Sequence, residues 1–171
     1  SGGAVAIGAA TLANGSQAVA LGPRARAEVT QSIAIGNDTR ATGTGSVSIG
    51  GDDSGSYNAY VFPAAAIGYS TNANPALSGN WRPTFSAGDG SLAISPHAQA
   101  LTKGSTAIGV GATAGEGTRS ATAPVTAAGI SLYTWTPSTT SIEATSVGAL
   151  SAATKAQSTA VGYKAKKKKK N

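Results

Sequence analysis

The side chains in this chain that could carry out chemistry are few, and they lack the companions that a catalytic or metal site needs. His97 is the only histidine, it lies between Pro96 and Ala98, and the chain has no cysteine. One imidazole supplies neither a set of metal ligands nor the base of a catalytic triad. We therefore expect His97 to be a surface turn residue, and the lack of cysteine excludes disulfides and thiol nucleophiles.

Two weaker patterns point to ligands, but each is incomplete. Asp52, Asp53 and Asp89 stand beside glycines without the regular aspartate spacing of a calcium-binding loop. The glycines of residues 109–115 resemble a phosphate loop, yet no Gly-Lys-Ser/Thr follows them. No pair of carboxylates shares a predicted strand face. The sequence therefore predicts no enzyme, no metal and no cofactor.

These side chains are carried by a chain that repeats one short stretch. Residues 4–8 read Ala-Val-Ala-Ile-Gly, and the first four copies close at glycines spaced fourteen residues apart. A fixed step of this kind indicates a solenoid, in which each coil packs on its neighbours. The nine copies are residues 4–8, 18–22, 32–36, 46–50, 64–68, 91–95, 105–109, 144–148 and 158–162.

Alternation within each copy predicts a short strand and argues against a helix. The residue before the closing position is aliphatic, the residue before that is Ala or Ser, and the next one back is mostly β-branched. We expect the aliphatic row to form the repeat core and the Ala/Ser row to form a flat outer surface. The expected core residues are Ile7, Leu21, Ile35, Ile49, Ile67, Ile94, Ile108, Val147 and Val161.

The closing glycine predicts a sharp turn, because glycine is favoured where the chain turns tightly or another backbone approaches closely. Small residues three and five positions beyond it predict a second, shorter strand in each coil. Turn chemistry also accounts better than glycosylation for the Asn-x-Ser/Thr triplets at Asn14 and Asn37. The expected turn glycines are Gly8, Gly22, Gly36, Gly50, Gly68, Gly109, Gly148 and Gly162.

A coil this thin buries little apolar area, so burial barely offsets the entropy of ordering it. The chain is therefore expected to be an obligate oligomer. The net charge of +6 does not indicate nucleic-acid binding, because Lys164 and residues 166–170 supply six of the thirteen basic residues and the rest of the chain is neutral. We expect residues 164–171 to be a flexible lysine-rich tail.

The copy over residues 31–41, Gln-Ser-Ile-Ala-Ile-Gly-Asn-Asp-Thr-Arg-Ala, resembles the head repeat of trimeric autotransporter adhesins, the YadA-like haemagglutinin family. The resemblance implies an all-β fold, a left-handed parallel β-roll (solenoid) of about nine 14-residue coils in a homotrimer. It also implies display on the bacterial surface, on a stalk and an outer-membrane anchor that are not in this sequence, and attachment to host extracellular matrix or cell-surface molecules. Ser95, in place of a closing glycine, departs from the family pattern.

Residues 1–163 are predicted to form this head, interrupted by insertions over about 51–62, 70–90 and 110–144. The insertions carry most of the aromatic residues, either as small local clusters against the roll or as contacts for a host ligand. Residues 128–136 alternate well enough to form an added strand or a hairpin arm. The candidate ligand contacts are Tyr57, Tyr60, Trp81, Tyr133 and Trp135.

Three other functions fit parts of the sequence. A purely structural spacer of an adhesin fibre needs only the repeat. An ice-binding solenoid needs a regular row of threonines, and the residues three positions after the closing glycine do not form one. A hexapeptide-type acyltransferase needs a coil of about eighteen residues and a catalytic histidine. The chain has no run of about eighteen apolar residues, so the sequence predicts no direct insertion into a membrane.

Overall fold

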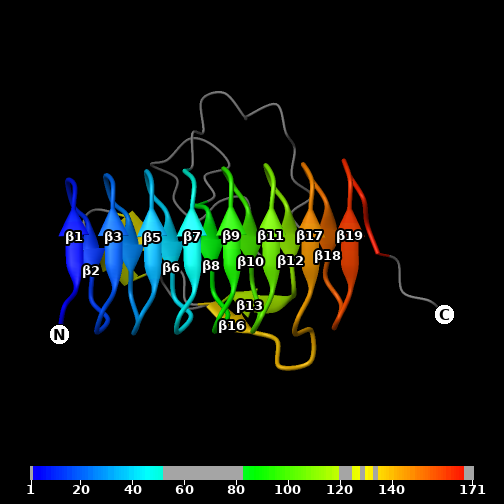
Figure 1. Ribbon diagram of the computed structural model, residues 1–171, viewed down its shortest axis with the longest axis horizontal. Helices are drawn as coiled ribbons and strands as arrows, with labels where there is room; N and C mark the ends of the chain where they lie inside the picture. Colours follow the sequence, from blue (N-terminus) through cyan, green and yellow to red (C-terminus); the bar gives the residue numbers. More distant parts are fainter. Residues whose placement is uncertain (1, 52–82, 120–124, 128–129, 133–134, 168–171) are drawn as a thin grey trace.

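The computed structural model describes residues 2–51, 83–119, 125–127, 130–132 and 135–167. Every regular element in these ranges is a β-strand, and most of the strands stack into one elongated body with the chain termini at opposite ends (Figure 1). The strands of the stack are parallel, which confirms the all-β, roll-like part of the expected fold. The described residues include no helix of the length and hydropathy needed to span a lipid bilayer.

The larger sheet contains eight parallel strands, one from each coil. Successive strands pair at equivalent repeat positions, as Ala20 does with Ala34. In spatial order the strands are β1 (Val5–Ile7), β3 (Val19–Leu21), β5 (Ile33–Ile35), β7 (Val47–Ile49), β9 (Leu92–Ile94), β11 (Thr106–Ile108), β17 (Thr145–Val147) and β19 (Thr159–Val161).

The smaller sheet lies behind the larger one in Figure 1 and is built from the shorter strand of each coil. It has seven parallel strands of two residues each. They are β2 (Leu12–Ala13), β4 (Arg26–Ala27), β6 (Arg40–Ala41), β8 (Phe85–Ser86), β10 (Gln99–Ala100), β12 (Thr113–Ala114) and β18 (Ala152–Ala153).

The side chains that the larger sheet points into the interior between the two sheets are those that the sequence analysis expected on the outside. Ala20, Ala34 and Ala93, at the centres of their strands, have no exposed surface. Ile7 and Val161, by contrast, are 63% and 67% exposed. The Ala/Ser row therefore forms the core, and the aliphatic row points away from it. The correction applies to Ile7, Leu21, Ile35, Ile49, Ile94, Ile108, Val147 and Val161, none of which is buried, while Ile67 lies outside the described residues.

The reversal follows from the narrowness of the coil. Four residues of each coil point inward. Two of them stand four and two positions before the closing glycine, and the other two stand three and five positions after it. In the coil closed by Gly36 these are Ser32, Ala34, Thr39 and Ala41, all without exposed surface. Two tight turns in fourteen residues hold the sheets so close together that only small side chains fit, and larger ones would overpack the interior.

Both turns of each coil require positive φ angles. The seven described closing glycines have φ between +117° and +159°, as the sequence predicts for turn residues, and Gly68 lies outside the described residues. They also stack on one another: a Cβ on Gly22 would lie 2.6 Å from the carbonyl oxygen of Gly36. Ser95 occupies the same corner with φ of +97°. This backbone conformation is strained for any residue that carries a side chain.

The described coils number eight where nine were expected. β7 pairs directly with β9, in the register Val47 to Leu92, so no strand lies between them. The copy over residues 64–68 lies outside the described residues. Residues 52–82 lie outside the described residues, and the expected insertion over 70–90 is wrong at its end, because β8 and the turn at Asp89 belong to a regular coil.

The later insertion is narrower than expected, and it leaves the roll at the other corner. β12 still occupies its place in the smaller sheet, and Ser141 already begins the next turn, so the inserted residues are about 116–140. They include two antiparallel pairs: β13 (Gly117–Arg119) with β16 (Trp135–Pro137), and β14 (Val125–Ala127) with β15 (Ile130–Leu132). The expected hairpin strand over 128–136 is confirmed in outline by β15 and β16.

The fourth coil differs from the others because its core is polar. Ser46, Ser48, Thr84 and Ser86 occupy its four inward positions, and none has exposed surface. Ser48 donates its hydroxyl to the carbonyl of Thr84 at 2.8 Å. This layer separates two alanine clusters, one in the first three coils and one from Ala93 onward.

Candidate interaction faces of the roll

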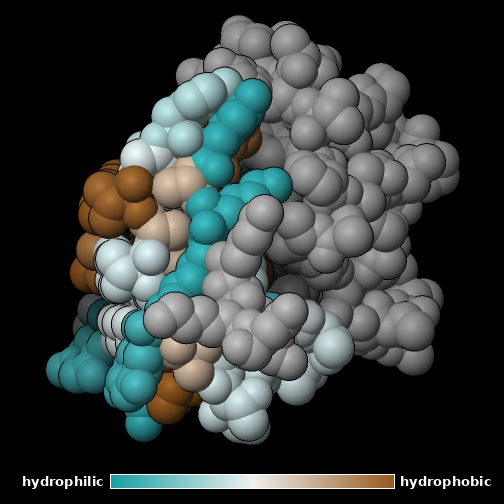
Figure 2. All heavy atoms as spheres, turned by 90° about the vertical axis from the view of Figure 1, so that its right-hand side faces the viewer, coloured by the Kyte–Doolittle hydropathy of each residue, from teal (hydrophilic) through white to brown (hydrophobic). Residues whose placement is uncertain are grey.

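Among the described residues, four of the five exposed large hydrophobic side chains lie on the outward side of the larger sheet, which we call the aliphatic face. Each of its strands presents two side chains outward, so two ladders run the length of the roll. Val5, Ile7, Ile49 and Val161 are 43%, 63%, 38% and 67% exposed. Figure 2 views the stack from its C-terminal end and shows the apolar residues gathered along one flank. An exposed apolar surface of this kind is a candidate interaction site.

The aliphatic face changes composition along the roll. From β1 to β9 both outward ladders are aliphatic, as in the pair Ile33 and Ile35. From β11 onward one ladder consists of Thr106, Thr145 and Thr159, which pair in register. The other ladder stays aliphatic to the end. Apolar burial against a partner would therefore be greatest over the first five rungs.

The outward side of the smaller sheet carries a cluster of charges, which we call the Arg–Glu–Arg cluster. Glu28 Oε1 accepts hydrogen bonds from Arg26 Nε at 3.1 Å and from Arg40 Nε at 2.7 Å. The three side chains are only 11% to 22% exposed. The Arg40 guanidinium also lies 5.4 Å from the centre of the Phe85 ring. Two guanidinium groups thus share the Glu28 carboxylate.

The electrostatics of Glu28 follow from this arrangement. Burial raises the pKa of Glu28, but the hydrogen bonds and charges of Arg40 and Arg26 outweigh burial and hold its pKa below the ordinary value of 4.5. The carboxylate therefore stays ionised at neutral pH. It joins β4 to β6 across the smaller sheet.

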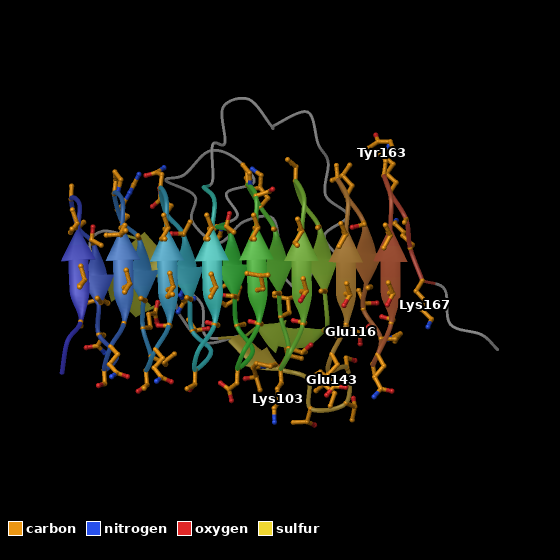
Figure 3. The ribbon with its side chains drawn as sticks, in the orientation of Figure 1. Lys103, Glu116, Glu143, Tyr163 and Lys167 are labelled. Atoms are coloured by element: carbon orange, nitrogen blue, oxygen red, sulfur yellow. The ribbon has the colours of Figure 1, made fainter. Side chains whose placement is uncertain are left out.

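A second polar group fixes the base of the later insertion. Lys155 Nζ pairs with Glu116 Oε1, and the Ser141 hydroxyl donates to Glu116 Oε2 at 3.4 Å. The carbonyl of Ser141 accepts a hydrogen bond from Thr102 Oγ1 at 2.7 Å. Figure 3 shows Glu116, Glu143 and Lys103 along the same lower edge of the roll. The two ends of the insertion are thus tied to the neighbouring coils.

Of the residues that the sequence singles out for metal or phosphate chemistry, Asp52 and Asp53 lie outside the described residues, and the others lie in turns and strands of the roll. His97 lies in a turn as expected, but it is 2% exposed, which corrects its expected surface position. Its backbone N–H donates to the Gly51 carbonyl at 3.4 Å. Asp89 Oδ1 accepts the N–H of Thr44 at 2.8 Å. Residues 109–115 form a turn and β12, and no cluster of three metal-ligating side chains exists within the described ranges.

The aromatic candidates for ligand contact are not brought together by the described part of the chain. Trp135 lies in β16, opposite Arg119, although the position of its side chain is not described. Tyr163, which was not among these candidates, is 66% exposed with Lys164 Nζ 5.0 Å from its ring centre, and Figure 3 places it at the C-terminal end of the roll. The other candidates, Tyr57, Tyr60, Trp81 and Tyr133, lie outside the described residues.

The aliphatic face is the side of the strands that the sequence interpretation placed in the interior. The signal that identifies it is the number of small positions in each coil. Four positions per coil are small and only two are aliphatic, so the small ones must fill the space between two sheets.

The profile of the YadA head domain repeat matches residues 2–25, 30–52, 96–120 and 140–165, which together make up more than half of the chain. The matched segments carry all the strands of the larger sheet except β9. No curated protein and no solved structure matches the chain significantly. The parallel roll with a glycine at each closing turn, together with the match, shows that this chain belongs to the YadA head domain repeat family.

Proposed function

We propose that the chain is the head of a homotrimeric bacterial surface adhesin, in which three copies bury their aliphatic faces against one another. The observation that carries the proposal is the exposed double ladder on the larger sheet. With strands spaced about 4.8 Å apart, its eight rungs form an apolar strip roughly 34 Å long. The interior of a single coil holds only small side chains, so burying this strip supplies the missing apolar area.

The three copies are proposed to present their insertions to the outside. The insertion at 116–140 starts at the corner that follows the smaller sheet, on the side of the roll away from the closing glycines. Trp81, Tyr133 and Trp135 are proposed as contacts to host extracellular matrix or cell-surface molecules. Threefold display multiplies weak contacts into firm attachment, because each further contact becomes intramolecular.

Attachment is tested with beads coated with the purified chain, on a panel of matrix proteins and cell-surface glycans. One variant replaces residues 52–82 with a short Gly/Ser linker, and a second replaces residues 120–134 in the same way. We expect at least one of them to lose binding while its sedimentation stays that of the parent. The lysine tail is removed in a matched control, so that retention by charge alone is recognised.

The outcomes separate adhesion from a purely structural role. If the intact trimer binds a ligand and neither linker variant weakens that binding, contact through the insertions is wrong. If the intact trimer binds nothing in the panel and does not attach to host cells, the adhesin proposal fails and a spacer role takes its place.

A further inference from the structure

Asn14 and Gly15 form the only Asn-Gly pair in the chain. Asn14 directly follows β2 and is exposed, and its N–H donates to the Ala27 carbonyl at 2.9 Å. Gly15 begins the turn that leads to β3 and is itself buried. A glycine after asparagine matters chemically, because without a Cβ its amide nitrogen is the least hindered nucleophile for the neighbouring side-chain carbonyl.

The Gly15 N–H lacks the hydrogen bond that occupies the same group in other coils. Where this turn begins with Val29, Thr102 or Lys155, the N–H donates to the hydroxyl of the serine three residues later, at 3.2 to 3.3 Å. Ala18 stands at that position after Gly15 and has no hydroxyl. Among the described residues the Gly15 N–H has no acceptor.

Asn37 provides a matched comparison within the same chain. It is exposed and also lies in a turn. The next residue, however, is Asp38, which has a side chain, and its N–H donates to the Pro23 carbonyl at 3.0 Å. The nitrogen that would attack the Asn37 side chain is therefore both hindered and hydrogen-bonded.

We propose that Asn14 is a site of spontaneous deamidation in the folded protein. The Gly15 nitrogen loses its proton and attacks Asn14 Cγ, which closes a five-membered succinimide and releases the side-chain nitrogen as ammonia. Water then opens the ring at one of its two carbonyls and leaves either aspartate or isoaspartate at position 14. The net change is the conversion of one amide and one water into a carboxylate and ammonium.

The new carboxylate would stand beside the Arg–Glu–Arg cluster. β2 pairs with β4 so that Leu12 faces Arg26, which places position 14 in register with Glu28, one strand away. The cluster carries two guanidinium groups and one carboxylate. An aspartate at position 14 would add a negative charge one strand away from these guanidinium groups, which favours this product electrostatically.

The isoaspartate product has a different consequence. It inserts one extra carbon into the main chain just before Gly15, where the coils are stacked so closely that a Cβ on Gly15 would lie 1.8 Å from the Val29 carbonyl oxygen. The corner cannot lengthen without displacing the next coil. We therefore expect the isoaspartate form to unfold at a lower temperature than the aspartate form.

The test is incubation of the folded chain at mildly alkaline pH, followed by peptide mapping with mass spectrometry. We expect the peptide containing Asn14 to gain about one mass unit several-fold faster than the peptide containing Asn37. Both aspartate and isoaspartate should appear, and isoaspartyl methyltransferase should label the second. The Asn14→Thr variant carries the residue type that is found at Thr42. It should leave the rate of deamidation at Asn37 unchanged.

Two results would overturn the proposal. One is equal conversion at Asn14 and Asn37 in the folded wild-type chain. The other is an intact Asn14 after an incubation that converts the same residue in the chain unfolded by urea. Both are read from the wild-type protein, so neither depends on whether the variant folds.

Discussion

At the scale of single residues, the closing glycines meet two requirements that substitution can separate: a positive φ and close contact with the next coil. Gly22 and Gly162 have nearly the same φ, +117° and +118°. A Cβ on Gly22 would lie 2.6 Å from the Gly36 carbonyl oxygen, whereas the nearest atom to one on Gly162 is at 4.0 Å. Both variants to alanine carry the conformational cost, and only the first carries the collision.

We expect Gly162→Ala to lower the free energy of unfolding by about 1–3 kcal/mol, the cost of a strained backbone conformation. Gly22→Ala should cost about 2 kcal/mol more, because the neighbouring coil must move. Urea denaturation of both variants beside the wild type measures the difference. Equal losses would show that the stacking of the corners contributes nothing.

Glu28 is the residue through which the smaller sheet responds to acid. Its pKa is held below 4.5, so its ionised form stabilises the fold above that pH, and this contribution is lost as the pH falls through the lowered pKa. Glu28→Gln should cost about 1–3 kcal/mol at neutral pH, because two poorly exposed guanidinium groups lose their shared partner.

Thermal denaturation at a series of pH values checks this prediction. The wild type and Glu28→Gln should converge in acid, below the ordinary pKa of the carboxyl. Glu143→Gln is the control, since Glu143 is exposed and accepts one hydrogen bond, from Gln157, at 3.2 Å. A gap between wild type and Glu28→Gln that persists unchanged in strong acid would contradict the assigned role.

At the scale of elements, alternation in the sequence predicts the position and parallel stacking of the strands but not the side of each strand that faces inward. Period-two alternation marks two faces without saying which of them is buried. The assumption that large apolar residues lie inside fails here, because the turns fix a spacing that admits Ala34 and excludes Ile35. Burial by a partner chain, which one sequence does not display, is the usual reason for such a pattern.

The insertion boundaries could be predicted only in part, for a related reason. The copy over residues 64–68 has the repeat pattern, yet in the described part of the chain β7 pairs directly with β9. Pattern matching scores each copy alone, whereas a coil needs two strands and two turns. β8 escapes detection because Phe85 gives it little likeness to the other short strands.

The polar fourth coil gives a prediction about paired and unpaired hydroxyls. Ser48 and Ser86 lie in the same coil without exposed surface, and Ser48 donates to the Thr84 carbonyl. The Ser86 hydroxyl has no partner among the described residues. Ser86→Ala should raise the free energy of unfolding by about 1–2 kcal/mol, and Ser48→Ala should lower it by about 1 kcal/mol.

Denaturant titration of the two alanine variants tests this pair. The Thr84 carbonyl keeps the Arg40 N–H as a donor, so Ser48→Ala leaves no orphaned acceptor and its effect stays moderate. Destabilisation by Ser86→Ala similar to that of Ser48→Ala would indicate that the Ser86 hydroxyl has a partner after all.

At the scale of the whole molecule, the roll is a thin wall with an interior of small side chains and an apolar outer strip. Coils contact only their neighbours, so stability along the chain is a sum of local terms. The strip runs across all eight rungs and can couple them if other copies cover it. Assembly would then make the melting temperature depend on protein concentration, because copies that bind only the folded form stabilise it.

Ile49 is the residue best placed to test that coupling. In the isolated chain it is 38% exposed, so a lysine there can extend into water and the single roll can tolerate it. In a trimer the same charge would be buried without a partner. We expect Ile49→Lys to abolish the trimer in sedimentation velocity, while Asn14→Lys, on the other sheet and beside Glu28, leaves it intact. An Ile49→Lys chain that sediments like the wild type, or a wild-type chain that stays a folded monomer at low concentration, would show that the aliphatic face is not the interface.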